Sequence, residues 1–363
     1  MQTQRSNRLM NSPVTGWLMA LPASVIIFTF IILPFLLGFY FAFTNQRFIS
    51  PNPTEYVGTS NFTQLLSVNV LTLEPERDPA TNEVKKAEDG TLVYPNLRSI
   101  TRNNPQYPQY NGMKEWFSWT SGDVRKIVVA SDVTFMKAII NTFEFVLVVA
   151  PVQGGLALLL ALMINQKLAG INIFRTIYFM PVVVSIVVVS LLWRFIYSGD
   201  NGLLNGILSL FTFGAFKPID WLGNTATALP SIMAMSIWQA VGFFMVIWLA
   251  GLQTIPVSLY EAADIEGASN WQKFRFVTWP GLRNTAILVI VVITMQAFTL
   301  YPQVAVMTGG GPLDSTQSIV FQAVDHGYNK QDVATGSTIS VILFIIVITI
   351  SLIQRYLTRE KTS

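Results

Sequence analysis

The sequence has no cysteine and a single histidine among its 363 residues. Without cysteine the chain can form no disulfide and offers no thiolate as a metal ligand or nucleophile. His326 lies in a polar loop, which indicates an exposed bystander. A G-x-x-x-x-G-K-[ST] phosphate loop is also missing, and no nucleophile, base and orienting group fall at a recognisable spacing. The sequence therefore predicts no catalytic residue, no metal site and no cofactor in this chain.

Charge is scarce as well. Charged residues make up 12% of the chain and hydrophobic residues 52%, and the mean hydropathy is +0.48. Soluble domains carry about 25% charged residues. A composition this apolar is typical of a membrane protein.

Six apolar runs approach or exceed the roughly 20 residues that cross a bilayer. They cover residues 16–43, 138–164, 173–197, 229–252, 286–306 and 336–353. The first is longer than the apolar part of a signal peptide and no A-x-A cleavage pattern follows it, so we interpret it as an uncleaved span. Six spans place both termini on one side of the membrane.

Basic residues set the orientation, because short cytoplasmic loops carry the excess of Lys and Arg. If the N-terminus is cytoplasmic, the inner segments hold Arg5, Arg8, Lys167, Arg175, Lys273, Arg275, Arg283, Arg355, Arg359 and Lys361. The two short outer loops hold Lys217 and Lys330. This asymmetry predicts that both termini lie in the cytoplasm and that residues 45–136 form an insertion outside.

The insertion differs in composition from the rest of the chain. It is rich in Pro, Asn and charged residues, and structureless loops of this length are uncommon. Aromatic residues such as Tyr94, Trp116 and Trp119 favour a small folded domain with a few strands. A partly disordered loop is the alternative.

A charged segment, EAADIEGASNWQKFRFVTWPGL, interrupts the apolar runs after residue 260. Ser258 precedes Glu261 by three residues and Ser269 precedes Gln272 by three, which is the spacing of a capping box. Gly267 between them suits a left-handed helix terminus. The pattern predicts two short helices hinged at a glycine, which either dock into a partner protein or lie on lipid.

This segment resembles the EAA loop of ABC importer permeases: E-A-A, three residues, G, nine residues, I, one residue, L-P. Glu261, Ala262, Ala263, Gly267 and Pro280 match, while Val277 and Trp279 are apolar replacements. Asn141-Thr142, FRTIYFMPVVVS and TGGGP are similar to the carbohydrate-importing branch, of the maltose and glycerol-3-phosphate type. The resemblance covers the first span and residues from 137 onward, but not the insertion.

The resemblance implies an all-α polytopic membrane protein with the type I importer permease fold, six transmembrane helices and an extracytoplasmic insertion after the first helix. The implied parts are 1–44 (cytoplasmic N-terminus and first helix), 45–136 (insertion), 137–358 (core, with the EAA loop 257–282) and 359–363 (cytoplasmic tail). The location implied is the bacterial inner, or plasma, membrane.

In that family the EAA loop forms a coupling helix that sits in a cleft of a separate ATPase. The resemblance thus assigns coupling to Glu261, Ala262, Ala263, Asp264, Gly267, Ala268 and Pro280. It implies that ATP and Mg are bound, and ATP is hydrolysed, by a partner ATPase dimer that drives alternating access. Further expected partners are a second, homologous permease (or a second copy of this chain), an extracytoplasmic solute-binding protein and membrane lipid, with no nucleic acid.

Polar and aromatic side chains within the spans are the candidates for substrate contact, because an unsatisfied polar group in lipid is costly. They are Trp238, Gln239, Gln296, Thr299 and Tyr301. The alternative is interhelical hydrogen bonding for the amides and interfacial anchoring for the aromatics. Because a phosphorylated substrate calls for Arg or Lys along the pathway, we expect a neutral sugar, glycoside or polyol.

Two other classes compete with the importer. A solitary secondary transporter needs ionisable residues in mid-span, and Glu144 and Arg194 lie toward span ends. A membrane-bound sensor explains the insertion as an extracytoplasmic ligand domain but leaves the EAA segment without a purpose.

Overall fold

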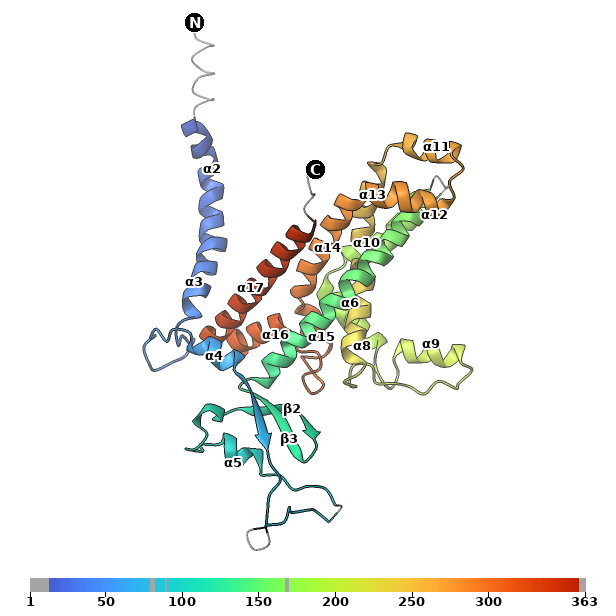
Figure 1. Cartoon of the computed structure of the whole chain (residues 1–363). Coiled ribbons are helices and arrows are strands. Elements are labelled where there is room, and N and C mark those ends of the chain that lie inside the picture. The colour runs from blue at the N-terminus through green and yellow to red at the C-terminus, as the bar shows by residue number, and fades with distance from the viewer. Residues whose placement is uncertain (1–12, 79–81, 89, 167–169, 359–363) are drawn as a thin grey trace. The chain divides into compact units, whose positions relative to one another are not determined.

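A computed structural model describes residues 13–78, 82–88, 90–166 and 170–358. Helices dominate the chain (Figure 1). Contacts within the chain divide it into two units. The first unit combines the residues up to Thr63 with Ala323–Ile342, and the second combines Gln64–Gln322 with the residues from Leu343 onward. Five basic residues of the orientation argument lie outside the described residues, as does the predicted tail 359–363: Arg5, Arg8, Lys167, Arg359 and Lys361.

The first unit holds the first candidate span, built from α2 (Pro13–Ile27), the π-helix η1 (Phe28–Ile32) and α3 (Leu33–Phe41). The carbonyl at the end of this span accepts hydrogen bonds from side chains further along the chain. Asn61 donates through Nδ2 to the carbonyl of Ala42 at 2.9 Å, and Thr338, in α17 (Val333–Thr358), donates to the same oxygen at 3.1 Å. These bonds fix the end of the first helix to the start of the last one.

The insertion contains a three-stranded antiparallel sheet of β1 (Val68–Leu73), β2 (Lys114–Ser121) and β3 (Val124–Ala130), in the order β1-β3-β2. One face buries Leu71, Leu73, Ile127 and Val129 together with Met113, beside α5 (Leu97–Thr101). The folded alternative is therefore confirmed for this segment. The chain is predominantly helical, and alternating apolar residues form strands within this insertion.

The core of the second unit is built on α6 (Val133–Ile164), α10 (Ala228–Gln253) and α14 (Arg283–Phe298). Small residues allow these helices to approach closely. The indole Nε1 of Trp248 donates to the carbonyl of Gly154 at 3.1 Å. A Cβ on Gly242 would clash with the carbonyl oxygen of Tyr178 in α7 (Ile171–Val183). Backbone contact at such small residues is typical of helix packing in membranes.

Four described helices, or helix combinations, are long and apolar enough to cross a membrane, and up to six spans result if two bent pairs each count as one. The first pair, α7 and α8 (Ile186–Ile196), is bent by 97°. In the second, residues Asn270–Gly281 meet α14 at 68°. Within the predicted spans 173–197 and 286–306, the helix is therefore interrupted. The first breaks after Val183, and the second ends at Phe298, ahead of α15 (Pro302–Met307).

Prolines account for these breaks. Pro181 lacks the N–H that would bond one turn back, and Val184 is extended, with φ −80° and ψ 137°. Pro302 disfavours a helical conformation in the residue before it, and Tyr301 has φ −138°.

The remaining elements are shorter. They are α4 (Ser60–Leu66), η2 (Pro108–Tyr110), α9 (Leu203–Phe211), α11 (Val257–Ile265), α12 (Asn270–Lys273), η3 (Phe274–Thr278), α13 (Trp279–Gly281), α16 (Ile319–Val324) and η4 (Asp325–Asn329).

Candidate functional site

The charged segment folds as predicted around its glycine. Helix α11 ends at Ile265, and Gly267 takes φ +71°. The amide of Ala268 donates to the carbonyl of Ala263 at 2.9 Å, and that of Gly267 to Asp264 at 3.1 Å. This pair of bonds is the Schellman closure, which needs a left-handed residue after the helix. The chain therefore reverses within two residues.

The second capping box is confirmed and the first is wrong. The Ser269 side chain accepts from the Gln272 amide while the Gln272 side chain accepts from the Ser269 amide, at 3.4 and 2.7 Å. Ser258, by contrast, lies inside α11, whose N-cap is Pro256. The helix begins at Val257, directly after Pro256, whose backbone is extended with φ −59° and ψ 131°.

Two side-chain contacts join α11 to the helices that follow it. Asp264 forms an ion pair with Lys273, and Tyr260 Oη lies 3.0 Å from Thr278 Oγ1. The acid comes from α11 and the base from α12, so the ion pair connects the two helices across Gly267. The loop is thus internally braced.

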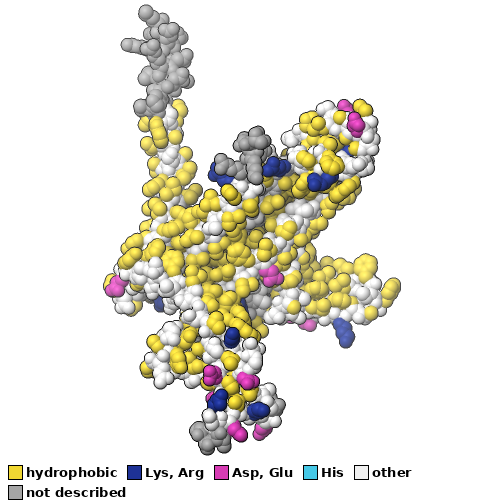
Figure 2. Space-filling view, viewed as in Figure 1, with side chains coloured by type: hydrophobic (Ala, Val, Ile, Leu, Met, Phe, Trp, Pro, Cys, Tyr) yellow, Lys and Arg dark blue, Asp and Glu magenta, His cyan; other side chains and the backbone are white. Residues whose placement is uncertain are grey.

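The remaining surface of the loop points outward. Glu261, Ala262, Gly267 and Pro280 are exposed. Hydrophobic side chains surround them, with Ile265 88%, Phe276 73% and Trp271 69% exposed. Figure 2 shows charged and hydrophobic side chains side by side on the part of the molecule that carries α11 and α12. A rigid, outward-facing helix with a thin alanine surface is suited to docking.

A pocket of about 260 Å³ lies beside the break between α7 and α8 and the break between α14 and α15. Ile186 begins the helix after the first break, Thr299 follows the end of α14, and Pro302 begins α15; all three line the pocket. Non-helical backbone at membrane depth is tolerated where it is buried in protein or lines a polar cavity. The two helix breaks therefore lie at the wall of this pocket, where such backbone is tolerated.

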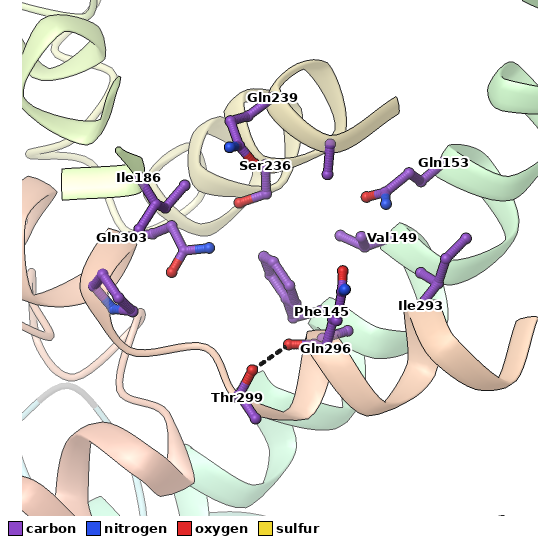
Figure 3. A pocket seen from close by; sticks show the side chains of 13 residues that line it. Phe145, Val149, Gln153, Ile186, Ser236, Gln239, Ile293, Gln296, Thr299 and Gln303 are labelled. Atoms are coloured by element: carbon purple, nitrogen blue, oxygen red, sulfur yellow. Dashed lines mark hydrogen bonds between the residues drawn. The ribbon is translucent and has the colours of Figure 1, made fainter. Parts of the chain in front are cut away.

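Amide side chains surround this pocket (Figure 3). The polar lining residues are Gln153, Ser236, Gln239, Gln296, Thr299 and Gln303, and the thirteen lining residues include no ionisable side chain. They come from α6, α10, α14, α15 and the turn after α14. The wall of the pocket therefore offers uncharged hydrogen-bond donors and acceptors.

Some of these polar groups are bonded within the protein and others are not. Gln239 Nε2 donates to the carbonyl of Pro181 at 3.5 Å, at the break of the first pair. Ser236 Oγ and Gln303 Oε1 are buried without a hydrogen-bond partner. A buried polar atom left unpaired costs free energy, so these two atoms can bind a polar group in the pocket.

The predicted substrate residues divide between the pocket and other places. Gln239, Gln296 and Thr299 line it. Trp238 is 46% exposed and packs on Trp193 with ring centroids 5.4 Å apart, and Tyr301 packs on Phe321.

The sequence interpretation missed three polar lining residues: Gln153, Ser236 and Gln303. Gln153 and Ser236 interrupt apolar runs, and that signal could have identified them.

No group of three or more His, Asp or Glu side chains within the described part of the chain is placed to hold a metal ion.

Broken spans around an uncharged pocket, with a braced loop beyond one end, define a polytopic membrane component of the permease type. The family model of the binding-protein-dependent transport system inner membrane component matches residues 153–362, more than half of the chain. The chain belongs to this family, as the EAA resemblance predicted. It is a permease subunit, and in such transporters a separate subunit hydrolyses ATP.

Relatives and solved structures agree. The trehalose/maltose transport system permease protein MalF of Thermococcus litoralis is 34% identical over 212 residues, covering 58% of this chain and 70% of the relative. The lactose transport system permease protein LacF of Rhizobium radiobacter is 32% identical, covering 74% and 89%. A crystal structure of a bacterial ABC transporter that imports the acidic polysaccharide alginate shares the fold, with a TM-score of 0.70 and 18% identity over 99% of this chain and all of the neighbour's.

Proposed function

We propose that this permease subunit lines the import pathway for an uncharged sugar, glycoside or polyol. The observation that carries the proposal is the pocket with four glutamines and no ionisable side chain at the breaks of two spans. An amide both donates and accepts hydrogen bonds, as a sugar hydroxyl does. The relatives named for trehalose, maltose and lactose transport support this class. An acidic polysaccharide such as alginate would call for cations that this wall lacks.

The size of the pocket supports a two-chain pathway. Its volume of about 260 Å³ is below the range of about 300–1,000 Å³ typical of ligand sites. This small volume supports a pathway in which a second, homologous permease supplies the opposite wall. Each chain then contributes six transmembrane helices to the pathway in the bacterial inner membrane. Both termini of each chain lie in the cytoplasm.

The loop 257–282 is the proposed contact to an ATPase dimer that binds ATP and Mg. It follows the end of α10, a helix of 26 residues, whose length of about 39 Å at 1.5 Å per residue separates the loop from the opposite membrane face. There the insertion meets the solute-binding protein. A solved relative of the fold is in complex with an alginate pentasaccharide-bound periplasmic protein, which supports this arrangement.

Pocket variants test the substrate role. We expect Gln296→Leu or Gln303→Leu to remove one hydrogen bond to the sugar, worth about 0.5–1.5 kcal/mol, which raises KM for uptake about 2- to 10-fold. The transporter, with its partner subunits, is reconstituted in proteoliposomes and given maltose, trehalose or lactose with the binding protein. Gln354→Leu is the matched control, because this amide bonds to Thr294 outside the pocket. Equal KM values in all three variants would contradict the assignment.

The coupling role is tested by purifying tagged chain with Glu261→Arg. The reversed charge lies at the centre of the exposed docking surface, and we expect the ATPase to be lost while the second permease still co-purifies. Glu55→Arg, an exposed residue of the first unit, is the control and retains both. An ATPase that remains bound to Glu261→Arg, or is absent from the wild type, rejects the docking.

A further inference from the structure

Helix α9 turns its apolar side outward. Leu203, Ile207, Leu210 and Phe211 are 61%, 41%, 75% and 78% exposed, and their spacing places them on one stripe of the helix. Asn205 lies on the other side and is 3% exposed. A surface helix of a soluble protein has the reverse arrangement. Hydrophobic side chains cover the visible surface of α9 in Figure 2.

Asn205 fixes the rotation of this helix. Its Nδ2 donates to the carbonyls of Gly199 and Ile219, each at 2.9 Å, and its Oδ1 accepts from Trp221 Nε1 at 2.8 Å. Rolling the apolar stripe inward would break these buried bonds. The exposure of the stripe is therefore a property of the fold.

The position of α9 is at the end of the spans. It follows α8 after a turn at residues 199–201, and after it the chain leads to the first residue of α10, Ala228. It runs across the end of α8 instead of continuing along it (Figure 1). The loop 257–282 follows the other end of α10. Helix α9 thus lies at the membrane boundary opposite that loop.

The composition of the segment indicates that lipid covers the exposed face of α9. Residues 201–216 contain no charged side chain, and Asp200 and Lys217 stand at the two ends. The segment also presents Phe213, which is 99% exposed. A protein interface surrounds its apolar core with a polar rim, whereas a helix lying in the membrane interface places Phe and Leu on the face that it buries in lipid. We propose that α9 is an interfacial helix whose stripe, Leu203, Ile207, Leu210 and Phe211, is seated among the lipid headgroups and upper acyl chains.

The bonds of Asn205 also connect α9 to the wall of a second cavity. Asn205 bonds to the carbonyls of Ser198 and Gly199, and these two residues line a pocket of about 550 Å³ together with Arg194 and Asp220. The lipid surface therefore positions one wall of this pocket.

The absence of cysteine allows a direct test. Leu210→Cys and Phe211→Cys carry a nitroxide in the full chain, reconstituted in vesicles of phosphatidylcholine and phosphatidylglycerol. Power saturation compares collisions with oxygen, which partitions into lipid, and with a water-soluble nickel chelate. Leu147→Cys on the exposed side of α6 is the lipid standard, and Thr72→Cys on an exposed strand position is the water standard.

We expect an oxygen-to-nickel ratio at both α9 positions several-fold above that of Thr72→Cys and below that of Leu147→Cys. A ratio equal to that of Thr72→Cys overturns the proposal. So does protection from both quenchers once the partner subunits are assembled, which would assign the stripe to a protein interface. The readout needs no transport, so it is independent of whether the proposed sugar function holds.

Discussion

The EAA loop and the pocket are built in opposite ways. The loop, residues 257–282, is exposed and charged, and its bracing contacts join residues at most 18 positions apart. The pocket is uncharged, and its lining runs from Phe145 to Gln303. The surface that we propose for docking is thus fixed by short-range bonds, whereas the shape of the pocket that we propose for the solute depends on how distant helices cross.

Helix α10 belongs to both regions, which gives a way to separate them. It supplies Ser236, Gln239 and Ala240 to the pocket, and the loop follows its end. A change at a helix crossing should damage the pocket while leaving the loop folded. A change at the hinge of the loop should do the reverse.

The largest effect is expected from Gly242→Ala, at the crossing of α10 and α7. An added Cβ would meet the backbone of Tyr178 and lie 3.0 Å from Phe179 Cα. Because backbone cannot move aside as a flexible side chain does, α7 must shift. The break between α7 and α8, which borders the pocket, then shifts with it. Overpacking of this kind costs about 1–3 kcal/mol or more. We expect a lower melting temperature in detergent and loss of sugar uptake.

Gly155→Ala is the matched control, because a Cβ there meets nothing within 4 Å. If Gly242→Ala melted and transported like Gly155→Ala, the crossing would not be what holds the pocket.

The next effect is expected at Gly267. Its Cβ would meet nothing within 4 Å, so the cost of Gly267→Ala comes from φ +71° alone. An L-residue in this conformation loses about 1–2 kcal/mol. We expect the ATPase to dissociate more readily during purification, with an unchanged melting temperature of the spans. Gly267→Asn should fall between wild type and alanine, because asparagine tolerates the left-handed region. Equal retention by all three proteins would show that the hinge is not needed for docking.

The same contrast explains what the sequence could predict. The Ser269 cap and the Gly267 terminus of the EAA loop depend on neighbours along the chain, and the structure confirms both. Their coupling role stays a prediction. The position of Gln303 in the pocket depends on the breaks before Ile186 and Pro302, and an apolar run read as one continuous span conceals such a break. Trp238 stays a candidate by composition, and its ring packs on Trp193 of α8.

The smallest effect is expected at the ion pair between Asp264 and Lys273, whose side chains are 60% and 21% exposed. Exposed pairs contribute about 0.2–1 kcal/mol. If the pair is only a brace within the loop, Asp264→Asn and Lys273→Met should weaken ATPase retention equally, and the double variant should be no worse than either. If Asp264 also binds the ATPase, Asp264→Asn alone should show the larger loss, and the loss should shrink in high salt. A double-mutant cycle on ATPase affinity therefore decides whether this acid belongs to the fold of the loop or to its docking surface.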